Sequence, residues 1–208
     1  MVAIVDYGVG NLFSLVSTFR IIGQEAIVSS DPDVLIRADR LILPGVGAFE
    51  DAMKKLTSSR LDLTVREFAS SGKPLMGICL GMQLLFDKSY EYGEFEGLGL
   101  IPGVIRPIRE KIPEDLKIPH IGWNALRMTD LKSPIYTKIS DGDFVYFVHS
   151  YYAADCDQHV TANAEYGSML TASVQKNNIY GCQFHPEKSG EVGLKILRAF
   201  CELEAVTC

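Results

Sequence analysis

The sequence lacks the features that mark membrane, secreted and nucleic-acid-binding proteins. Its apolar runs are only as long as a strand, which excludes a membrane-spanning helix. It begins with the strand-like segment Val2–Val5, without the basic and apolar regions of a signal peptide. The net charge is −6 and there is no basic run, so we expect no nucleic acid as partner. The short apolar runs lead us to expect no membrane partner either.

Cysteine is scarce and irregularly placed. The odd number and uneven spacing do not describe a disulfide framework, which favours reduced thiols and a cytoplasmic location. No cysteine or histidine pair has zinc-ligand spacing, so we expect no metal and no cofactor. The five cysteines are Cys79, Cys156, Cys182, Cys201 and Cys208.

The remaining sequence describes one globular domain, residues 1–208, of the α/β class. The first half alternates strands and helices, which predicts a parallel sheet covered by helices. The second half has closely spaced strands separated by turns, mostly antiparallel, and a last helix. Predicted strands are Val2–Val5, Glu25–Val28, Arg40–Leu43, Pro74–Ile78, Gly103–Ile108, Trp123–Arg127, Phe144–Val148, Val160–Tyr166, Leu170–Gln175 and Ile179–Gln183. Predicted helices are Leu12–Ile22, Asp33–Ala38, Phe49–Thr57, Leu61–Ser70, Leu80–Phe86 and Gly190–Glu204.

The segment around Cys79 carries the strongest chemical signal. An apolar strand leads into Gly77-Ile78-Cys79-Leu80-Gly81, and an apolar helix follows. Small residues two positions on either side of a nucleophile are what a sharp strand-to-helix elbow requires. Such an elbow exposes the sulfur at a helix N-terminus, where partial positive charge favours the thiolate. The alternative is a buried cysteine at the end of an apolar strand.

A histidine and a carboxylate stand together near the end of the chain, in the run Gly181-Cys182-Gln183-Phe184-His185-Pro186-Glu187-Lys188. A cysteine nucleophile needs a base within hydrogen-bond reach, and the base needs a carboxylate to orient it. In an extended segment His185 and Glu187 point to the same side, and Pro186 favours that geometry. Alone, the run also fits a solvated turn; with the cysteine elbow, it predicts a catalytic triad.

Two glycine-containing loops follow predicted parallel strands and should meet the elbow at one sheet edge. Pro44-Gly45-Val46-Gly47 lets backbone N–H groups approach a ligand closely. Together with the N–H of Leu80, it would supply the two donors that an oxyanion needs. Gly8-Val9-Gly10-Asn11 lacks the third glycine of a dinucleotide fingerprint, so nucleotide binding is not favoured.

The run Gly77–Gln83 with His185-Pro186-Glu187 resembles the class I, triad-type glutamine amidotransferases. The resemblance extends from about Val2 to about Glu204 and implies a flavodoxin-like mixed sheet, parallel in the N-terminal half, with antiparallel strands in the C-terminal half and flanking helices. Further runs resemble the glutamine amidotransferase subunits of imidazole glycerol phosphate synthases, which serve histidine biosynthesis. These runs are Ile4–Asn11, Pro44–Phe49, Ile121–Asn124, Val148–Tyr152 and Glu187–Gly190.

The resemblance also implies roles for individual residues in glutamine hydrolysis. Cys79 would be the nucleophile, His185 its base and Glu187 the group that orients His185. Val46 and Leu80 would form the oxyanion hole, while His149 is structural. For Glu91, a solvated loop charge is the alternative role. L-glutamine would be held by Gly47, by Gln83 at its backbone end, by Glu91 at its α-ammonium and by Ser150 and Tyr151 at its α-carboxylate.

A partner is implied in the same way: a (β/α)8 cyclase subunit of imidazole glycerol phosphate synthase, joined as a heterodimer. It would use the ammonia to make imidazole glycerol phosphate and aminoimidazole carboxamide ribonucleotide. Asn11, Trp123 and Lys188 would lie at the interface, with core packing as the alternative for Trp123. The Gly45–Val46 peptide is flanked by Gly45 and Gly47, so its plane can turn with little steric cost. We therefore expect the isolated chain to be a poor glutaminase that its partner activates.

Three other interpretations compete with this one. The first is another triad amidotransferase, against which the Gly-Trp-Asn and His-Ser-Tyr-Tyr runs argue. The second is a cysteine hydrolase or peptidase on a related fold, which ammonia release from glutamine would distinguish. The third is a catalytically silent regulatory subunit, against which the intact Cys79, His185 and Glu187 argue.

Overall fold

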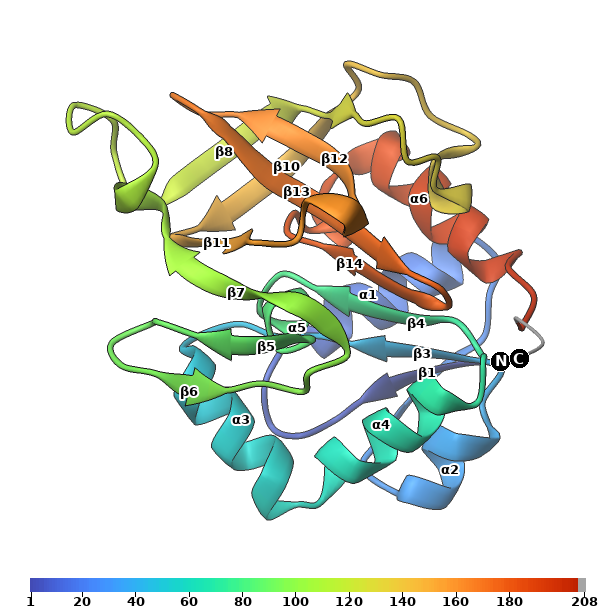
Figure 1. Cartoon of the computed structure of the whole chain (residues 1–208). Coiled ribbons are helices and arrows are strands. Elements are labelled where there is room, and N and C mark those ends of the chain that lie inside the picture. The colour runs from blue at the N-terminus through green and yellow to red at the C-terminus, as the bar shows by residue number, and fades with distance from the viewer. Residues whose placement is uncertain (206–208) are drawn as a thin grey trace.

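An eight-stranded mixed sheet forms the centre of the protein, seen in a computed structural model that describes residues 1–205 (Figure 1). The strand order is β2-β1-β3-β4-β14-β13-β12-β9. Strands from β2 to β14 pair in parallel, and those from β14 to β9 pair antiparallel, which confirms the predicted mixed sheet. The strands are β1 Val2–Val5, β2 Ala26–Ser29, β3 Arg40–Leu43, β4 Leu75–Ile78, β9 Arg127–Met128, β12 Val160–Glu165, β13 Met169–Lys176 and β14 Ile179–Cys182.

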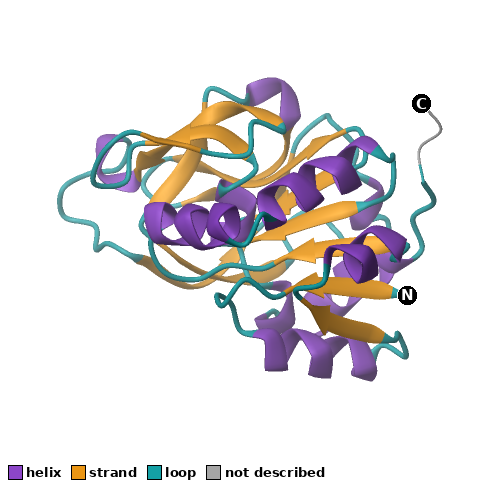
Figure 2. Cartoon of the chain, turned by 90° about the horizontal axis from the view of Figure 1, so that it is seen from below, coloured by secondary structure: helices purple, strands orange, loops and turns teal. Residues whose placement is uncertain are grey.

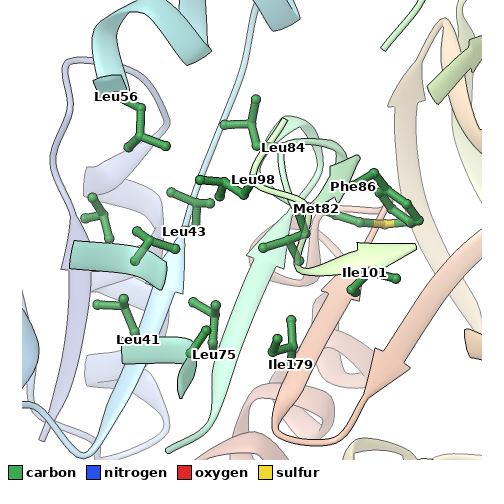
Figure 3. Close-up of a cluster of buried hydrophobic side chains, with 14 of the residues drawn as sticks. Leu41, Leu43, Leu56, Leu75, Met82, Leu84, Phe86, Leu98, Ile101 and Ile179 are labelled. Carbon is green, nitrogen blue, oxygen red and sulfur yellow. The ribbon is translucent and has the colours of Figure 1, made fainter. Parts of the chain in front are cut away.

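Helices cover both faces of this sheet (Figure 1, Figure 2), which is why the central parallel strands are apolar along their whole length. On one face, Leu15 and Phe19 of α1 and Phe200 of α6 pack with Val2 and Ile4 of β1. On the other face, α2, α3 and α4 pack on the cluster shown in part in Figure 3, which includes Leu41, Leu43 and Leu56. The helices are α1 Leu12–Ile21, α2 Pro32–Arg37, α3 Phe49–Ser58, α4 Leu61–Ser70, α5 Leu80–Gln83 and α6 Gly190–Cys201.

Two smaller sheets, which the sequence did not predict, stand beside the central one. One pairs β8 (His120–Ala125) with β10 (Phe144–His149). The other has the order β11-β7-β5-β6. Only Ser150 separates β10 from β11, so the chain passes from one small sheet to the other at this residue. The four strands of the second sheet are β5 Phe86–Ser89, β6 Phe95–Glu96, β7 Ile101–Pro107 and β11 Tyr151–Ala154.

The helix predicted over Leu80–Phe86 is wrong beyond its first turn. It ends at Gln83, and β5 begins at Phe86. Leu84 and Leu85 are fully buried, and their backbone carbonyls accept hydrogen bonds from the N–H groups of Leu98 and Leu100. This pairing with a later segment replaces the helical hydrogen bonds.

Other boundaries differ by smaller amounts. The strand predicted over Trp123–Arg127 begins at His120 and is interrupted at Leu126, which bonds to Asp143 and Gly142 instead of continuing the ladder. The last helix ends at Cys201, three residues before the predicted Glu204. Cys208, one of the thiols expected to be reduced, lies outside the described residues. The other four cysteines, Cys79, Cys156, Cys182 and Cys201, are free.

Candidate active site

Cys79 stands on a sharp turn between β4 and α5. Its φ of 54° and ψ of −112° lie in a region that a residue with a side chain adopts only under strain. A Cβ on Gly81 would lie 1.9 Å from the Leu43 carbonyl oxygen, and one on Gly77 would lie 2.6 Å from the Gly81 oxygen. No other residue type fits either position. These contacts are the physical reason for the glycine spacing around the elbow.

His185 and Glu187 face each other beside this turn. Nδ1 of His185 lies 2.7 Å from Oε1 of Glu187, and their side chains are only 3% and 2% exposed. That burial excludes the solvated-turn alternative. With Nδ1 donating to the carboxylate, Nε2 is left for the sulfur of Cys79. Burial alone lowers the pKa of His185, but its interactions with Cys79 and Glu187 outweigh burial and raise the pKa to about 9.

A pocket of about 350 Å³ opens over Cys79 and contains every residue predicted for catalysis or substrate binding except Glu187, which lies behind His185. The walls of the pocket come from the central sheet and from the two smaller sheets. This is because the chain passes from β10 to β11 at Ser150, next to the elbow. Among its lining residues are Val46, Gly47, Cys79, Leu80, Gln83, Glu91, Ser150, Tyr151, His185 and Lys188.

The loop after β3 packs directly on the elbow. The hydroxyl of Tyr7 donates to the Pro44 carbonyl at 2.7 Å, and a Cβ on Gly45 would lie 2.6 Å from the Gly81 nitrogen. The loops that follow β1, β3 and β4 therefore meet at one edge of the sheet, as their positions after parallel strands predict. Leu80 is the first residue of α5, so its N–H has no acceptor within the helix.

Glu91 is buried, which contradicts a solvated loop charge. Its side chain is 9% exposed, and Oε2 accepts a hydrogen bond of 2.6 Å from the N–H of Phe49, the first residue of α3. Burial raises the pKa of this carboxyl, although the Phe49 hydrogen bond opposes the rise. The carboxylate thus lies in the pocket wall, where a cation would replace the hydration that it loses.

The residues predicted for the interface lie at or beyond the pocket rim. Lys188 lines the pocket. Asn11 is exposed, and its side-chain oxygen accepts from the N–H of Ser14 at the start of α1. Trp123 is 55% exposed, which contradicts the core-packing alternative.

A buried pair of histidines, His120 and His149, stands beside Cys79, and His149 is one of the residues that line the pocket. His149 Nδ1 lies 2.8 Å from the Tyr151 carbonyl, and its Nε2 lies 3.0 Å from Nδ1 of His120. Since the carbonyl only accepts, His149 donates to it and accepts from His120. Burial lowers the pKa of His149 to about 3 and that of His120 to about 4, so both rings are neutral. These contacts are those of a structural residue, the role predicted for His149. His120 was missed, although it stands directly opposite His149 across β8 and β10.

The described residues contain neither a cluster suited to a metal ion nor a helix suited to a membrane. Within residues 1–205, no group of three or more histidine, cysteine or acidic side chains is arranged to hold a metal ion. None of the helices in the same range is both long and apolar enough to span a membrane.

The chain is similar to known glutamine amidotransferases along nearly its whole length. The chain matches the family model described as glutamine amidotransferase class-I over residues 3–203. It is 49% identical over 200 residues to imidazole glycerol phosphate synthase subunit HisH of Bacillus cereus (strain G9842), covering 96% of this chain and 93% of that protein. It is 47% identical over 205 residues to the subunit of the same name from Wolinella succinogenes, covering 98% and 100%.

Solved structures share the fold at lower identity. One described as a glutamine amidotransferase has a TM-score of 0.74 at 20% identity, covering 97% of this chain and 98% of that one. PurLQS from Thermotoga maritima has a TM-score of 0.71 at 21% identity, covering 96% of each chain.

Proposed function

Because the chain belongs to the class-I glutamine amidotransferase family, and within it to the HisH subunits of imidazole glycerol phosphate synthase, we propose that Cys79, His185 and Glu187 are its catalytic triad. The protein hydrolyses glutamine and supplies ammonia for histidine biosynthesis. The observation that most directly supports this triad is the 2.7 Å contact between buried His185 and Glu187 beside the strained Cys79.

Each member of the triad would have its own role. Glu187 would hold the imidazole of His185 in the tautomer that presents Nε2 to Cys79. His185 would take the proton of Cys79 and leave a thiolate as the nucleophile. The sulfur attacks the amide carbon of the glutamine side chain, and His185 passes its proton to the departing ammonia. Water then gives a proton back to His185 and cleaves the γ-glutamyl thioester, which releases glutamate and restores the thiolate.

The pocket supplies groups that match the two ends of the substrate. Buried Glu91 would pair with the α-ammonium, and the backbone at Ser150 and Tyr151 would bind the α-carboxylate. Gln83 and Gly47 would complete this end. The N–H groups of Val46 and Leu80 would stabilise the oxyanion of the acyl-transfer step, a role worth about 10²–10³ in rate for each donor.

The partner we infer is the cyclase subunit of the same synthase, in a heterodimer that consumes the ammonia. The names of the relatives, which describe them as subunits, support this assignment. Exposed Trp123 and Ile121 lie on β8, beside the strand that leads to Ser150, and Trp is a frequent interface anchor. We place the heterodimer in the cytoplasm because the four cysteines within residues 1–205 are free. We also infer that docking of the cyclase subunit turns the Gly45–Val46 peptide, so that the N–H of Val46 points at the oxyanion.

Substitution of the nucleophile tests the triad. In the complex, Cys79→Ala should abolish glutamine-dependent synthesis of imidazole glycerol phosphate and leave ammonia-dependent synthesis largely intact. Cys156→Ala, at a buried thiol outside the pocket, is the matched control and should retain both activities. Equal loss of the two activities in Cys79→Ala would contradict the proposal.

A further inference from the structure

A buried amide touches the sulfur of Cys79, and the triad does not account for it. The side chain of Gln183 is fully buried, just after β14, and its Nε2 lies 3.8 Å from Sγ of Cys79. Burying an amide costs free energy unless its donors and acceptor are satisfied. A leucine or methionine would fill a buried position here without that cost. The amide therefore needs a chemical explanation.

The orientation of this amide follows from its neighbours. Nε2 of Gln83 lies 3.3 Å from the Tyr151 carbonyl and 3.0 Å from Oε1 of Gln183. A carbonyl can only accept, so the nitrogen of Gln83 must face it. The second N–H of Gln83 then points at Gln183, which must present its oxygen there and its nitrogen to the sulfur.

This arrangement matters because the sulfur needs different neighbours in its two forms. As a thiol, it can donate to the Val148 carbonyl, which lies 3.9 Å away. When the proton passes from Sγ to His185, the electron pair left on sulfur can only accept, and the Val148 oxygen becomes a repulsive neighbour. An amide N–H aimed at the sulfur then stabilises the charged form, as hydrogen bonds to ions are stronger than those between neutral groups.

We propose that Gln183 is a further catalytic residue, whose amide N–H donates to the Cys79 thiolate while Gln83 holds that amide in the donating orientation. The inference rests on the proposed function, since it assigns Gln183 to the same nucleophile. It also gives Gln83 a second task beside its place in the substrate pocket. The oxygen of Gln83 remains available to the substrate, because both of its N–H groups are used within the protein.

The test measures alkylation of Cys79 by iodoacetamide as a function of pH in the full chain, read by mass spectrometry of the peptide that contains Cys79. Gln183→Met removes the donor and keeps the approximate volume. Gln83→Leu leaves Gln183 in place but frees its amide to rotate. Gln175→Met on β13, whose side chain bonds Ser133 rather than the active site, is the matched control.

Both Gln183→Met and Gln83→Leu should move the midpoint of alkylation upward by about one pH unit, the shift that corresponds to one hydrogen bond to a charged group. Gln175→Met should leave it unchanged. A loss of glutaminase activity in Gln183→Met with an unmoved midpoint would show that Gln183 is only structural, and would overturn the inference. If Gln183→Met fails to fold, Gln83→Leu decides: an upward shift of its alkylation midpoint supports the inference, and an unmoved midpoint overturns it.

Alkylation requires no turnover of glutamine, so the two proposals fail separately. A wild-type complex without glutaminase activity whose variants still shift the midpoint would refute the proposed function alone. A fully active complex whose variants show no shift would refute the role of Gln183 alone.

Discussion

Replacement of Gly81 by alanine should separate β3 from the nucleophile elbow. The added Cβ would lie 1.9 Å from the Leu43 carbonyl oxygen, 2.8 Å from the Leu43 carbonyl carbon and 3.0 Å from the Pro44 carbonyl carbon. All three are backbone atoms, so no side-chain rotation relieves the collision. A carbon and a carbonyl oxygen in contact lie about 3.3 Å apart or more, so the two segments must move apart by about 1.4 Å.

This displacement would move both the predicted oxyanion hole and the nucleophile. Leu43 and Pro44 lead directly into Val46, the predicted oxyanion donor, while Gly81 follows Cys79 by two residues. A misplacement of about 1 Å costs about 10²-fold in rate. Overpacking costs about 1–3 kcal/mol of stability. We therefore expect Gly81→Ala to lose at least about 10²-fold in glutaminase activity while the protein remains folded.

The assay is glutamate production by the complex, with urea unfolding of each variant measured in parallel. Gly23→Ala is the control, since Gly23 has a φ of 75° and no atom within 4 Å of the added Cβ. It should lose about 1 kcal/mol of stability from backbone strain alone and keep its activity. Wild-type activity in Gly81→Ala would refute the close packing of β3 on the elbow.

Three other predictions follow from the same structure. Imidazole NMR between pH 5 and pH 8 should show His120 and His149 neutral and His185 protonated near neutrality. Because burial lowers the pKa of His120 to about 4 and that of His149 to about 3, their contribution to stability should fall as pH drops from 6.5 through these values. The contribution of His185, whose pKa is raised, should be lost as pH rises through about 9. Neutral His185 at pH 7 would contradict this. Trp123→Ala should weaken binding of the cyclase subunit by about 2 kcal/mol, measured by calorimetry. Its melting temperature should not change, because the side chain of Trp123 is exposed. Unchanged affinity would show that Trp123 is not part of the interface. Glutaminase rates should rise from the isolated chain to the complex and again with the cyclase ligand, and equal rates would refute gating by the Gly45–Val46 peptide.

The elbow at Cys79 and the contact between His185 and Glu187 were predictable because their signals are local in the sequence. Gly77 and Gly81 frame Cys79 within one turn of chain, and His185 and Glu187 are separated by a single proline. Their chemistry depends on short-range backbone geometry, which residue types at fixed spacing largely determine. The parallel half of the sheet was predictable for a similar reason, since its strands are continuous apolar runs between amphipathic helices.

The missed features depend on contacts between distant segments. Nothing local to Leu84 and Leu85 shows that their carbonyls pair with Leu98 and Leu100. The change of sheet at Ser150 likewise depends on which strands β10 and β11 meet.

The polar network behind the pocket was missed for the same reason. The buried amide of Gln183 finds its partners 100 and 104 residues earlier in the chain, and the neutral His120 meets His149 across 29 residues. Burial alternates along Phe144–His149, which places His149 on the buried side, but this pattern does not identify His120 as its partner.

Cys79 is the group that we propose glutamine acylates. Acid quenching of the complex during turnover of isotopically labelled glutamine, followed by peptide mass spectrometry, tests it directly. We predict a labelled γ-glutamyl thioester on the peptide that contains Cys79, absent from Cys79→Ala. Label on another cysteine, or steady glutamate production by Cys79→Ala, would contradict it.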